Sequence, residues 1–143
     1  MNVASILKVK GRDVITVSST DSISVVAAIL GQRRIGAVLV VDDEGRLQGL
    51  LSERDIVRAL AESGGSCLDF RVQDLMTTNL VTIGPADTID RVMALMTEKR
   101  IRHLPVLEEG KLVGFISIGD VVKSRIDEVE REAAALRDYI ATG

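Results

Sequence analysis

A serine followed three residues later by an aspartate occurs at two related places, as Ser52 with Asp55 and as Ser117 with Asp120. A carboxylate held at a helix start can accept both hydroxyls of a ribose, while the free N–H groups and the helix dipole favour a nearby anion. The same spacing is close to a capping box, in which hydroxyl and carboxylate satisfy the first backbone N–H groups of the helix. Taken alone, either pair is better explained as a cap.

The surroundings of the two pairs are also alike, which indicates an internal duplication. Residues 49–57 read GLLSERDIV and residues 114–122 read GFISIGDVV. Upstream, the matched positions are Thr16 and Thr82, Asp21 and Asp87, Ile23 and Ile89, Arg34-Ile35 and Arg100-Ile101, and Leu47 and Leu112. The offset is 66 from Thr16 to Thr82 and 65 from Ser52 to Ser117, because the acidic turn at 42–45 is one residue longer than that at 108–110. The duplication predicts two similar units with pseudo-two-fold symmetry and two candidate sites.

Two repeated features favour a site over a simple cap. Thr16 and Thr82 recur at the expected end of a strand, upstream of each pair. Each pair also follows a glycine, Gly49 or Gly114, which permits a close approach to the backbone.

Each copy has the pattern of a strand, a helix, a hairpin of two strands and a second helix. A β-branched run predicts the first strand, Ser22 or Thr88 caps the first helix, and Ser52 or Ser117 opens the second. In the first copy we expect a strand at 14–17, a helix to about 32, strands at 37–41 and 47–51, and a helix ending near 63–65. In the second copy we expect strands at 80–83, 104–107 and 112–116. One helical turn is expected at 72–77.

These elements divide the chain into four parts. We expect a first repeat with its lead-in at 1–64, a linker at 65–79, a second repeat at 80–124 and a helical extension at 125–143. The extension places apolar residues at alternating steps of three and four, which forms a seam for another helix. These are Ile126, Val129, Ala133, Leu136 and Ile140. At barely two heptads the seam is too short to stand alone, and dimerisation and docking on its own domain both remain open.

Composition limits the classes of function. A chain of 143 residues falls in the size range of one compact domain, which buries roughly 68–70% of its unfolded surface, so the two copies are expected to share a core. A net charge of −3 argues against a nucleic-acid binder. The longest apolar run is too short to span a bilayer, so no membrane partner is expected. Cys67, the single cysteine, stands beside Gly64-Gly65 in an expected loop, and the cytoplasm is the default compartment.

Catalysis has little support in the sequence. His103 is the only histidine and Cys67 the only cysteine, so one chain holds no zinc-type cluster and no Cys–His dyad. A Walker-type phosphate loop is missing, and no two acids are paired as general acid and base. We expect a protein that is not an enzyme and has no catalytic cofactor and no bound metal; a small phosphohydrolase is a remote alternative.

The chain resembles a tandem pair of CBS domains (together a Bateman module) over essentially its whole length. The resemblance rests on the duplicated Gly-x-x-Ser-x-x-Asp, on the lead-in at 74–77 (DLMT) and on residues 102–106 (RHLPV). It implies an α+β fold of two pseudo-symmetric β-α-β-β-α repeats packed through their sheets, followed here by the long C-terminal helix. Similar proteins bind AMP, ADP, ATP, NAD or S-adenosylmethionine in clefts between the repeats.

The resemblance also implies which residues hold the ligand: the aspartate grips the ribose, the threonine and the second strand line the adenine slot, and basic residues at the strand start reach phosphates. The second-repeat site would comprise Thr82, Arg102, His103, Leu104, Pro105, Ser117 and Asp120. The first-repeat site would comprise Thr16, Gly36, Ala37, Ser52, Arg54 and Asp55. Because Gly36-Ala37 aligns with Arg102-His103, we expect a tighter, phosphate-dependent second site and a weaker or vacant first site.

These expectations converge on a signalling protein: a homodimeric sensor of adenine nucleotides, AMP in the first place with ATP or NAD as alternatives. Binding would shift its conformation and act on an effector protein in trans. The alternative is a structural dimeric subunit whose Ser-x-x-Asp pairs are only caps.

Overall fold

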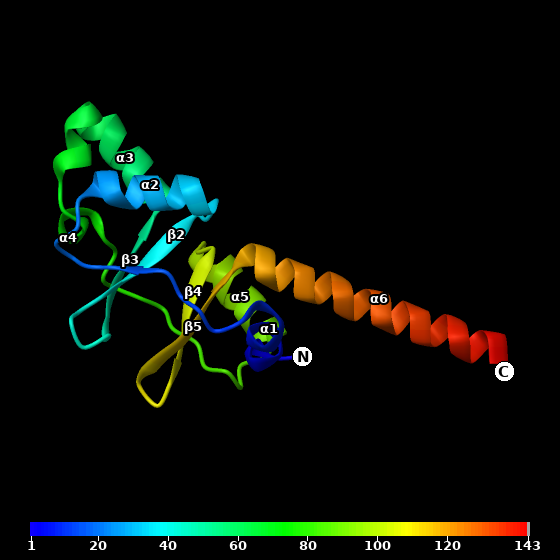
Figure 1. Ribbon diagram of the computed structural model, residues 1–143. Coiled ribbons are helices and arrows are strands. Elements are labelled where there is room, and N and C mark those ends of the chain that lie inside the picture. Colours follow the sequence, from blue (N-terminus) through cyan, green and yellow to red (C-terminus); the bar gives the residue numbers. More distant parts are fainter. Residues whose placement is uncertain (143) are drawn as a thin grey trace. The chain divides into compact units, whose positions relative to one another are not determined.

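The computed structural model describes residues 1–142 and confirms a mixed α+β fold with two small sheets (Figure 1). The last residue of the expected extension, Gly143, lies outside the described residues. The chain divides into two compact units. One contains Asp13–Val81 and Gly110–Leu112, and the other contains Met1–Arg12, Thr82–Glu109 and the described residues from 113 to 142.

The unit that holds the first copy is built on a three-stranded sheet. Its elements are β1 (Thr16–Val17), α2 (Ile23–Arg33), β2 (Ala37–Val41), β3 (Leu47–Ser52), α3 (Glu53–Ser63), the 3₁₀ helix η1 (Gly64–Asp69) and α4 (Val72–Leu75). β2 pairs in parallel with β1 and antiparallel with β3. Its core joins Val17, Val38, Val40 and Leu51 of the strands to Ile23, Val26 and Leu30 of α2, Ile56 of α3 and Val72 of α4.

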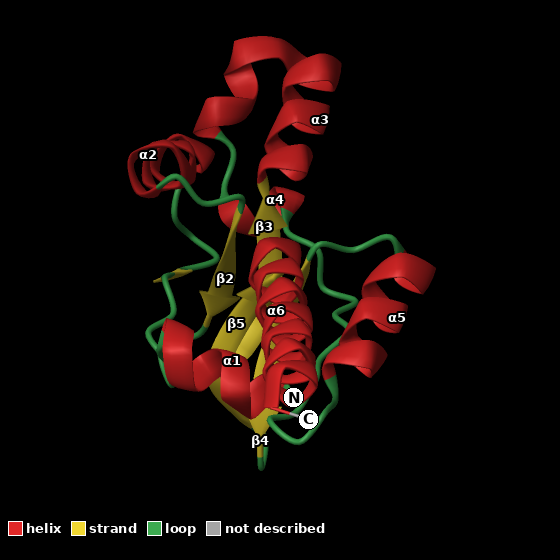
Figure 2. Cartoon of the chain, turned by 90° about the vertical axis from the view of Figure 1, so that its right-hand side faces the viewer, coloured by secondary structure: helices red, strands yellow, loops and turns green. Residues whose placement is uncertain are grey.

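The unit that holds the second copy has a two-stranded sheet. Its elements are α1 (Val3–Lys10), α5 (Ile89–Lys99), β4 (His103–Glu108), β5 (Lys111–Ser117), of which residues 113–117 belong to this unit, and α6 (Ile118–Thr142). α6 packs against both α1 and α5 (Figure 2). Its buried residues, Val121 and Ser124, lie in its first two turns.

The expected strand at 80–83 is wrong: this segment contributes only one parallel bridge, Ile83 to Val106. In the first copy the N–H of Leu39 donates to the carbonyl of Ile15 at 3.4 Å and extends the pairing of β1. The residue equivalent to Leu39 at the offset of 66 is Pro105, which has no N–H to donate. The pairing therefore shrinks to two bonds, Ile83 N to Pro105 O and Leu107 N to Ile83 O.

Equivalent backbone bonds confirm the alignment of the two copies. The N–H of Glu53 donates to the carbonyl of Gly36 at 2.9 Å, and the N–H of Ile118 donates to that of Arg102 at 2.8 Å. The helices α2 and α5 begin at the expected caps, Ser22 and Thr88, whose side chains accept from the third backbone N–H. Both helices end in a left-handed arginine, Arg34 with φ 54° and Arg100 with φ 55°.

Two segments outside the repeats also take regular structure. The expected helical turn at 72–77 is confirmed as α4. Cys67, expected in a loop, instead lies in η1 and is fully buried, because η1 packs against α2 and α3. A buried thiol behaves as a small apolar side chain.

The two lead-in segments are exchanged between the units. α1 precedes the first copy but joins the unit of the second, where Val3 N donates to Asp87 O at 2.9 Å. Thr77, which follows α4 and precedes the second copy, exchanges backbone bonds with Leu50 of β3. Each copy is thus completed by the lead-in of the other.

Candidate functional site

Both Ser-x-x-Asp pairs form complete capping boxes. Asp55 Oδ2 accepts from Ser52 N at 2.9 Å, and Asp120 Oδ2 accepts from Ser117 N at 2.8 Å. In return each serine Oγ accepts from the aspartate N–H, at 3.4 Å in the first copy and 3.2 Å in the second. The capping role is therefore real, and it fixes each carboxylate in one orientation.

The caps use only one oxygen, Oδ2, of each carboxylate. Every hydrogen bond that Asp55 and Asp120 accept from the described residues goes to Oδ2, including those from the serine hydroxyls at 3.2 and 3.1 Å. Oδ1 of both residues accepts none from this part of the chain. A carboxylate oxygen has two lone pairs, so Oδ1 can accept a sugar hydroxyl without disturbing the cap.

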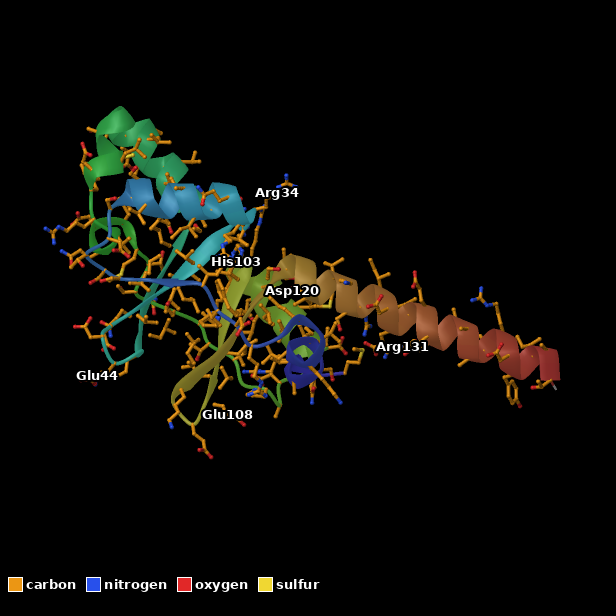
Figure 3. All side chains as sticks on the ribbon, in the orientation of Figure 1. Arg34, Glu44, His103, Glu108, Asp120 and Arg131 are labelled. Carbon is orange, nitrogen blue, oxygen red and sulfur yellow. The ribbon has the colours of Figure 1, made fainter. Side chains whose placement is uncertain are left out.

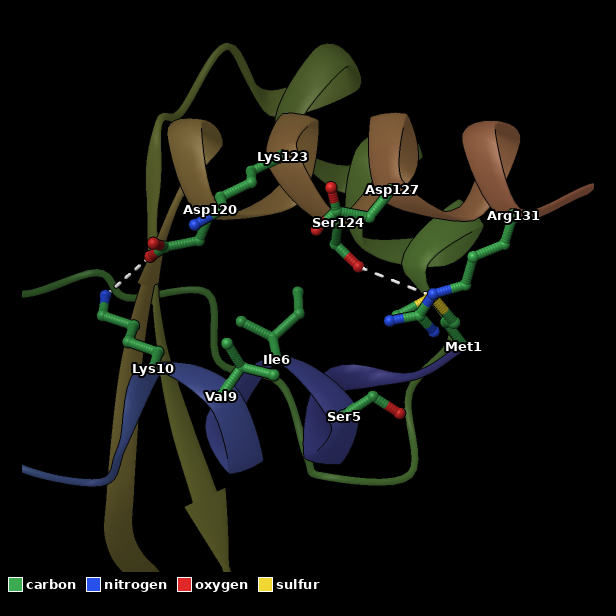
Figure 4. A pocket seen from close by; sticks show the side chains of 10 residues that line it. All are labelled: Met1, Ser5, Ile6, Val9, Lys10, Asp120, Lys123, Ser124, Asp127 and Arg131. Carbon is green, nitrogen blue, oxygen red and sulfur yellow. Dashed lines mark hydrogen bonds and ion pairs between the residues drawn. The ribbon is translucent and has the colours of Figure 1, made fainter. Parts of the chain in front are cut away.

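The two acids differ in their charged neighbours. Lys10 Nζ lies 2.6 Å from Asp120 Oδ2 and also donates to the carbonyl of Phe115 at 2.6 Å (Figure 4). The pair is partly exposed, with 37% of the Lys10 side chain and 25% of the Asp120 side chain accessible. Among residues 1–142, Asp55 forms no ion pair. One candidate acid is thus neutralised within the protein and the other is not.

The environment of Asp120 shifts its acidity. Burial alone would raise the pKa of this carboxyl, since it disfavours the charged form. The hydrogen bonds from Lys10 and Ser117 and the Lys10 charge outweigh burial, so the pKa of Asp120 lies below its ordinary value. The carboxylate is ionised at neutral pH and ready to accept hydrogen bonds.

Asp120 lies at the start of α6 and at one end of a groove between α1 and α6 (Figures 3 and 4). The groove has a volume of about 270 Å³. It has an apolar floor and a charged rim. Ile6 and Val9 line it from α1, and Lys123, Asp127 and Arg131 line it from α6. Of the residues expected in the second site, only Asp120 borders this groove.

The other residues expected in the second site lie near the start of β4. Thr82 and Arg102 are exposed, whereas Leu104 and Pro105 are buried, and the Leu104 side chain is a core residue. The His103 ring is partly buried and tilts against Phe115, with ring centroids 5.6 Å apart.

The residues expected in the first site all lie in the other unit. Thr16 is exposed on β1, Gly36 is half-buried, and Ala37 is 4% exposed at the start of β2. Arg54 is exposed and borders a shallow depression on α3. Because neighbouring helical residues point in different directions, Arg54 and Asp55 do not face the same way.

The two glycines before the motifs serve packing. A Cβ on Gly114 would lie 2.5 Å from a Leu7 methyl of α1, and a Cβ on Gly49 would lie 2.9 Å from the Thr77 carbonyl oxygen. Because these glycines have no side chain, the lead-in segments can pack directly against them: Leu7 against Gly114, and Met76 and Thr77 against Gly49. Their presence therefore does not favour a ligand site over a cap, contrary to the expectation from the sequence.

Sequence reasoning missed Lys10 and Phe115. One signal could have found Lys10: at the offset of 66 it corresponds to Met76, so the two lead-ins differ in charge at one position. No local pattern in the sequence indicates that Lys10 contacts Asp120, which lies 110 positions away.

Two classes of feature were searched in the described part of the chain. Residues 1–142 contain no group of three or more His, Cys, Asp or Glu side chains that could hold a metal ion. None of the helices in this range has the length and apolar character needed to cross a membrane.

Comparison with known proteins agrees with this architecture. The CBS domain family matches residues 6–62 and 72–127, which is most of the chain. The chain therefore belongs to the CBS-domain family, as a protein with two CBS domains. It is 32% identical to the mitochondrial CBS domain-containing protein CBSX3 of Arabidopsis thaliana, over 99% of this chain and 72% of that one.

Two solved structures extend the comparison. A CBS-domain containing protein from Agrobacterium tumefaciens is 46% identical, with a TM-score of 0.85, over 87% of this chain and 99% of that one. The CBS domain pair of protein MJ0100 is 27% identical, with a TM-score of 0.79, over 90% of this chain and 98% of that one. That pair was solved in complex with 5′-methylthioadenosine and S-adenosyl-L-methionine.

Proposed function

We propose that this protein is a non-catalytic regulatory module that binds an adenosine-containing ligand, with Asp55 and Asp120 as the acids that hold the ribose. The observation that carries the proposal is the free Oδ1 on each carboxylate, whose orientation the cap already fixes. The adenosine-type ligands of the MJ0100 CBS pair support the same ligand class.

The energy of such a site is sufficient for a cellular metabolite. A micromolar ligand requires about 8 kcal/mol of binding free energy. Each hydrogen bond to a charged group contributes about 1.5–3 kcal/mol, and burial of an adenine ring adds an apolar term. Two ribose hydroxyls on one carboxylate therefore supply a large share of the total.

The charges near the second acid support a phosphate-dependent second site. Arg102 and His103 stand at the start of β4 and Lys10 at the end of α1, all in the unit that contains Asp120. The Lys10 ammonium on Oδ2 partly neutralises the Asp120 carboxylate, which weakens the hydrogen bonds that Oδ1 accepts from a ribose, and the same ammonium can pair with a phosphate of the ligand. Met76 takes the place of Lys10 in the other lead-in, which supports a first site that depends less on phosphate.

Which nucleotide binds and which protein responds to binding are more specific proposals. We take AMP as the first candidate, with ATP or NAD as alternatives, and expect no turnover of any of them. A ligand shifts a conformational balance only through its different affinity for the two states. A partner protein in the same compartment, expected to be the cytoplasm, would respond to that shift.

A structural subunit without a ligand is the second candidate. The two capping boxes are complete without any ligand, and α6 exposes an apolar seam, both of which favour this alternative. The two proposals differ in one measurable property: only the sensor binds adenosine compounds.

Isothermal titration calorimetry on matched variants tests the proposal. Asp120→Ala should weaken AMP binding by about tenfold to a hundredfold, which corresponds to about 1.4–2.8 kcal/mol. Asp87→Ala is the control, because Asp87 accepts the Gly84 N–H at 2.7 Å and caps the preceding turn in the same unit. Equal losses of AMP affinity in both variants would indicate that Asp120 acts only as a helix cap. Absence of heat with AMP, ATP, NAD and 5′-methylthioadenosine in the unmodified protein would favour the structural subunit.

A further inference from the structure

The helix α6 presents two different apolar faces. The first faces its own unit: Val121 is 1% exposed and Ser124 7% exposed, and this face contacts α1 and α5. The second face, here called the α6 seam, consists of Val122, Ile126, Val129, Ala133, Leu136 and Ile140. At 100° per residue, the centre of the seam is turned by roughly 130°, about a third of a circle, from the packed face.

The described chain leaves the seam uncovered. Val122 is 45% exposed, Ile126 and Val129 are each 52%, Leu136 is 60% and Ile140 is 68%. Beyond Ser124 the helix continues for about five turns and extends past the rest of its unit (Figure 1). Docking of the seam on its own unit, one of the two alternatives left open by the sequence, is therefore not what the structure contains.

The seam follows a heptad pattern, and its side chains suit a coiled coil of two helices. Ile126, Ala133 and Ile140 occupy the a positions, and Val129 and Leu136 occupy the d positions. In parallel coiled coils, β-branched residues at a together with leucine at d, as at Leu136, favour two helices over three or four. A helix that exposes these residues is stabilised when a second seam covers them.

The charges that flank the seam identify the second helix as a copy of α6. In a parallel, in-register pair, each g position faces the e position five residues later on the other helix. Arg125 would face the partner's Glu130, and Glu132 would face the partner's Arg137, so both flanking contacts join opposite charges. The ion pairs of Arg125 within its own chain, at 3.4 Å to Asp90 and 3.5 Å to Glu128, leave it 43% exposed.

An antiparallel pair fits less well. The register that covers the whole seam sets Val122 opposite the partner's Ile140, Ile126 opposite the partner's Leu136 and Val129 opposite the partner's Ala133. That register places Glu130 against the partner's Glu130, Glu132 against the partner's Glu132, and Lys123 against the partner's Arg137. The flanking contacts of this antiparallel pair therefore join like charges, whereas those of the parallel pair join opposite charges.

We propose that the α6 seam is a homodimer interface in which two copies of α6 form a short parallel coiled coil over residues 126–140. This inference does not depend on ligand binding, since at 100° per residue Asp120 lies on nearly the opposite side of α6 from the seam. It assigns the part of α6 beyond Ser124 to self-association.

Analytical ultracentrifugation without ligand tests the interface. The unmodified protein should be a dimer at micromolar concentration, and Leu136→Glu with Ile140→Glu should raise the dissociation constant at least about a hundredfold. Both residues are exposed, so the monomer should keep its thermal unfolding temperature. Ala135→Glu, an exposed site on α6 off the seam, is the control and should leave the dimer unchanged. A monomeric unmodified protein, or a dimer insensitive to the double substitution, would overturn the proposal.

Two further variants test whether the second helix is a copy of α6 and whether the two helices run parallel. Glu132→Arg should weaken the dimer because it sets two arginines against each other, and adding Arg137→Glu should restore it. Leu136→Cys, in a chain carrying Cys67→Ala, should form an intermolecular disulfide under mild oxidation. Cross-linking through Leu136→Cys supports the parallel register, because the antiparallel pair sets this residue opposite the partner's Ile126 and separates the two copies of residue 136 by about 15 Å along the helix axis. Failure to cross-link while the dimer persists contradicts that register.

Discussion

The Lys10 ammonium lies 2.6 Å from Asp120 Oδ2 and thereby neutralises one of the two acids that the duplication supplies. Its equivalent in the other lead-in is Met76, and Asp55 has no ion pair within the described residues. Sites that look alike in sequence are therefore electrostatically different. The difference arises from a helix that precedes one copy and packs with the other.

Lys10→Met should change which ligands bind best. The variant removes the charge that partly neutralises Asp120 and so makes its free oxygen a stronger acceptor. An uncharged nucleoside such as 5′-methylthioadenosine should therefore bind more tightly. AMP should gain less or lose affinity, because its phosphate loses a cation. We expect the ratio of the AMP and nucleoside dissociation constants to rise by about tenfold, or 1.4 kcal/mol. Calorimetry with both ligands measures it. Lys8→Met, an exposed change on α1, is the control, and an unchanged ratio in Lys10→Met would argue against this electrostatic role of Lys10.

The Lys10–Asp120 pair should make stability depend on pH in a defined direction. The pKa of Asp120 is below its ordinary value in the folded protein, so the folded state binds fewer protons than the unfolded state at mildly acidic pH. The stabilisation is present above the ordinary pKa and is lost as the pH falls through the lowered value. For a partly exposed pair we expect about 1 kcal/mol or less.

Urea unfolding of the unmodified protein and of Asp120→Asn between pH 3 and pH 7 measures this contribution. The difference in unfolding free energy should shrink as the pH falls, and 0.5 M salt should reduce it at pH 7. A difference that grows toward low pH would contradict the assignment.

The glycines before the two motifs should tolerate a methyl group to different degrees. Gly49→Ala would place a Cβ 2.9 Å from a backbone oxygen, and Gly114→Ala would place one 2.5 Å from the end of the Leu7 side chain. Overpacking costs about 1–3 kcal/mol, and we expect the larger loss at Gly49 because a backbone atom yields less than a side-chain tip. Gly65→Ala, with nothing within 4 Å, is the matched control in thermal unfolding. In a Leu7→Ala background, Gly114→Ala should cost less than it does in the unmodified protein, whereas the cost of Gly49→Ala should stay the same.

The Cys67 thiol should report on opening of the first unit. Because Cys67 is fully buried in η1, an aromatic disulfide reagent should label it slowly in the native protein and at once in denaturant. Substitution of Phe70, which packs against the core of that unit, with alanine should speed labelling. Rapid labelling of the unmodified native protein would show that η1 does not protect the thiol as described.

Sequence periodicity predicted much of the fold, because many of its caps and turns are formed by residues close together in the sequence. The caps at Ser22, Thr88 and Ser52 were predictable because a capping bond joins residues only three positions apart. The hairpin β2–β3 followed from two apolar runs around a glycine turn, and Gly45 has φ 79° as that turn requires. The first strand of the second copy failed because Pro105, on a different segment, cannot donate to it.

The candidate site was predictable only in its repeated part. The spacing of Ser117 and Asp120 marked the acid, since both residues lie on one short segment. The burial of Leu104 depends on the packing of its own unit, which its strand pattern leaves open.

By itself the sequence determined the duplication, the capped acids and the heptad spacing of the last helix, because each is a relation between residues near one another or repeated at a fixed offset. Only the tertiary structure decided that Lys10 neutralises Asp120, across 110 positions, and that the α6 seam stays exposed. Contacts between distant segments depend on how whole helices and strands pack, and no local pattern of residues encodes that packing.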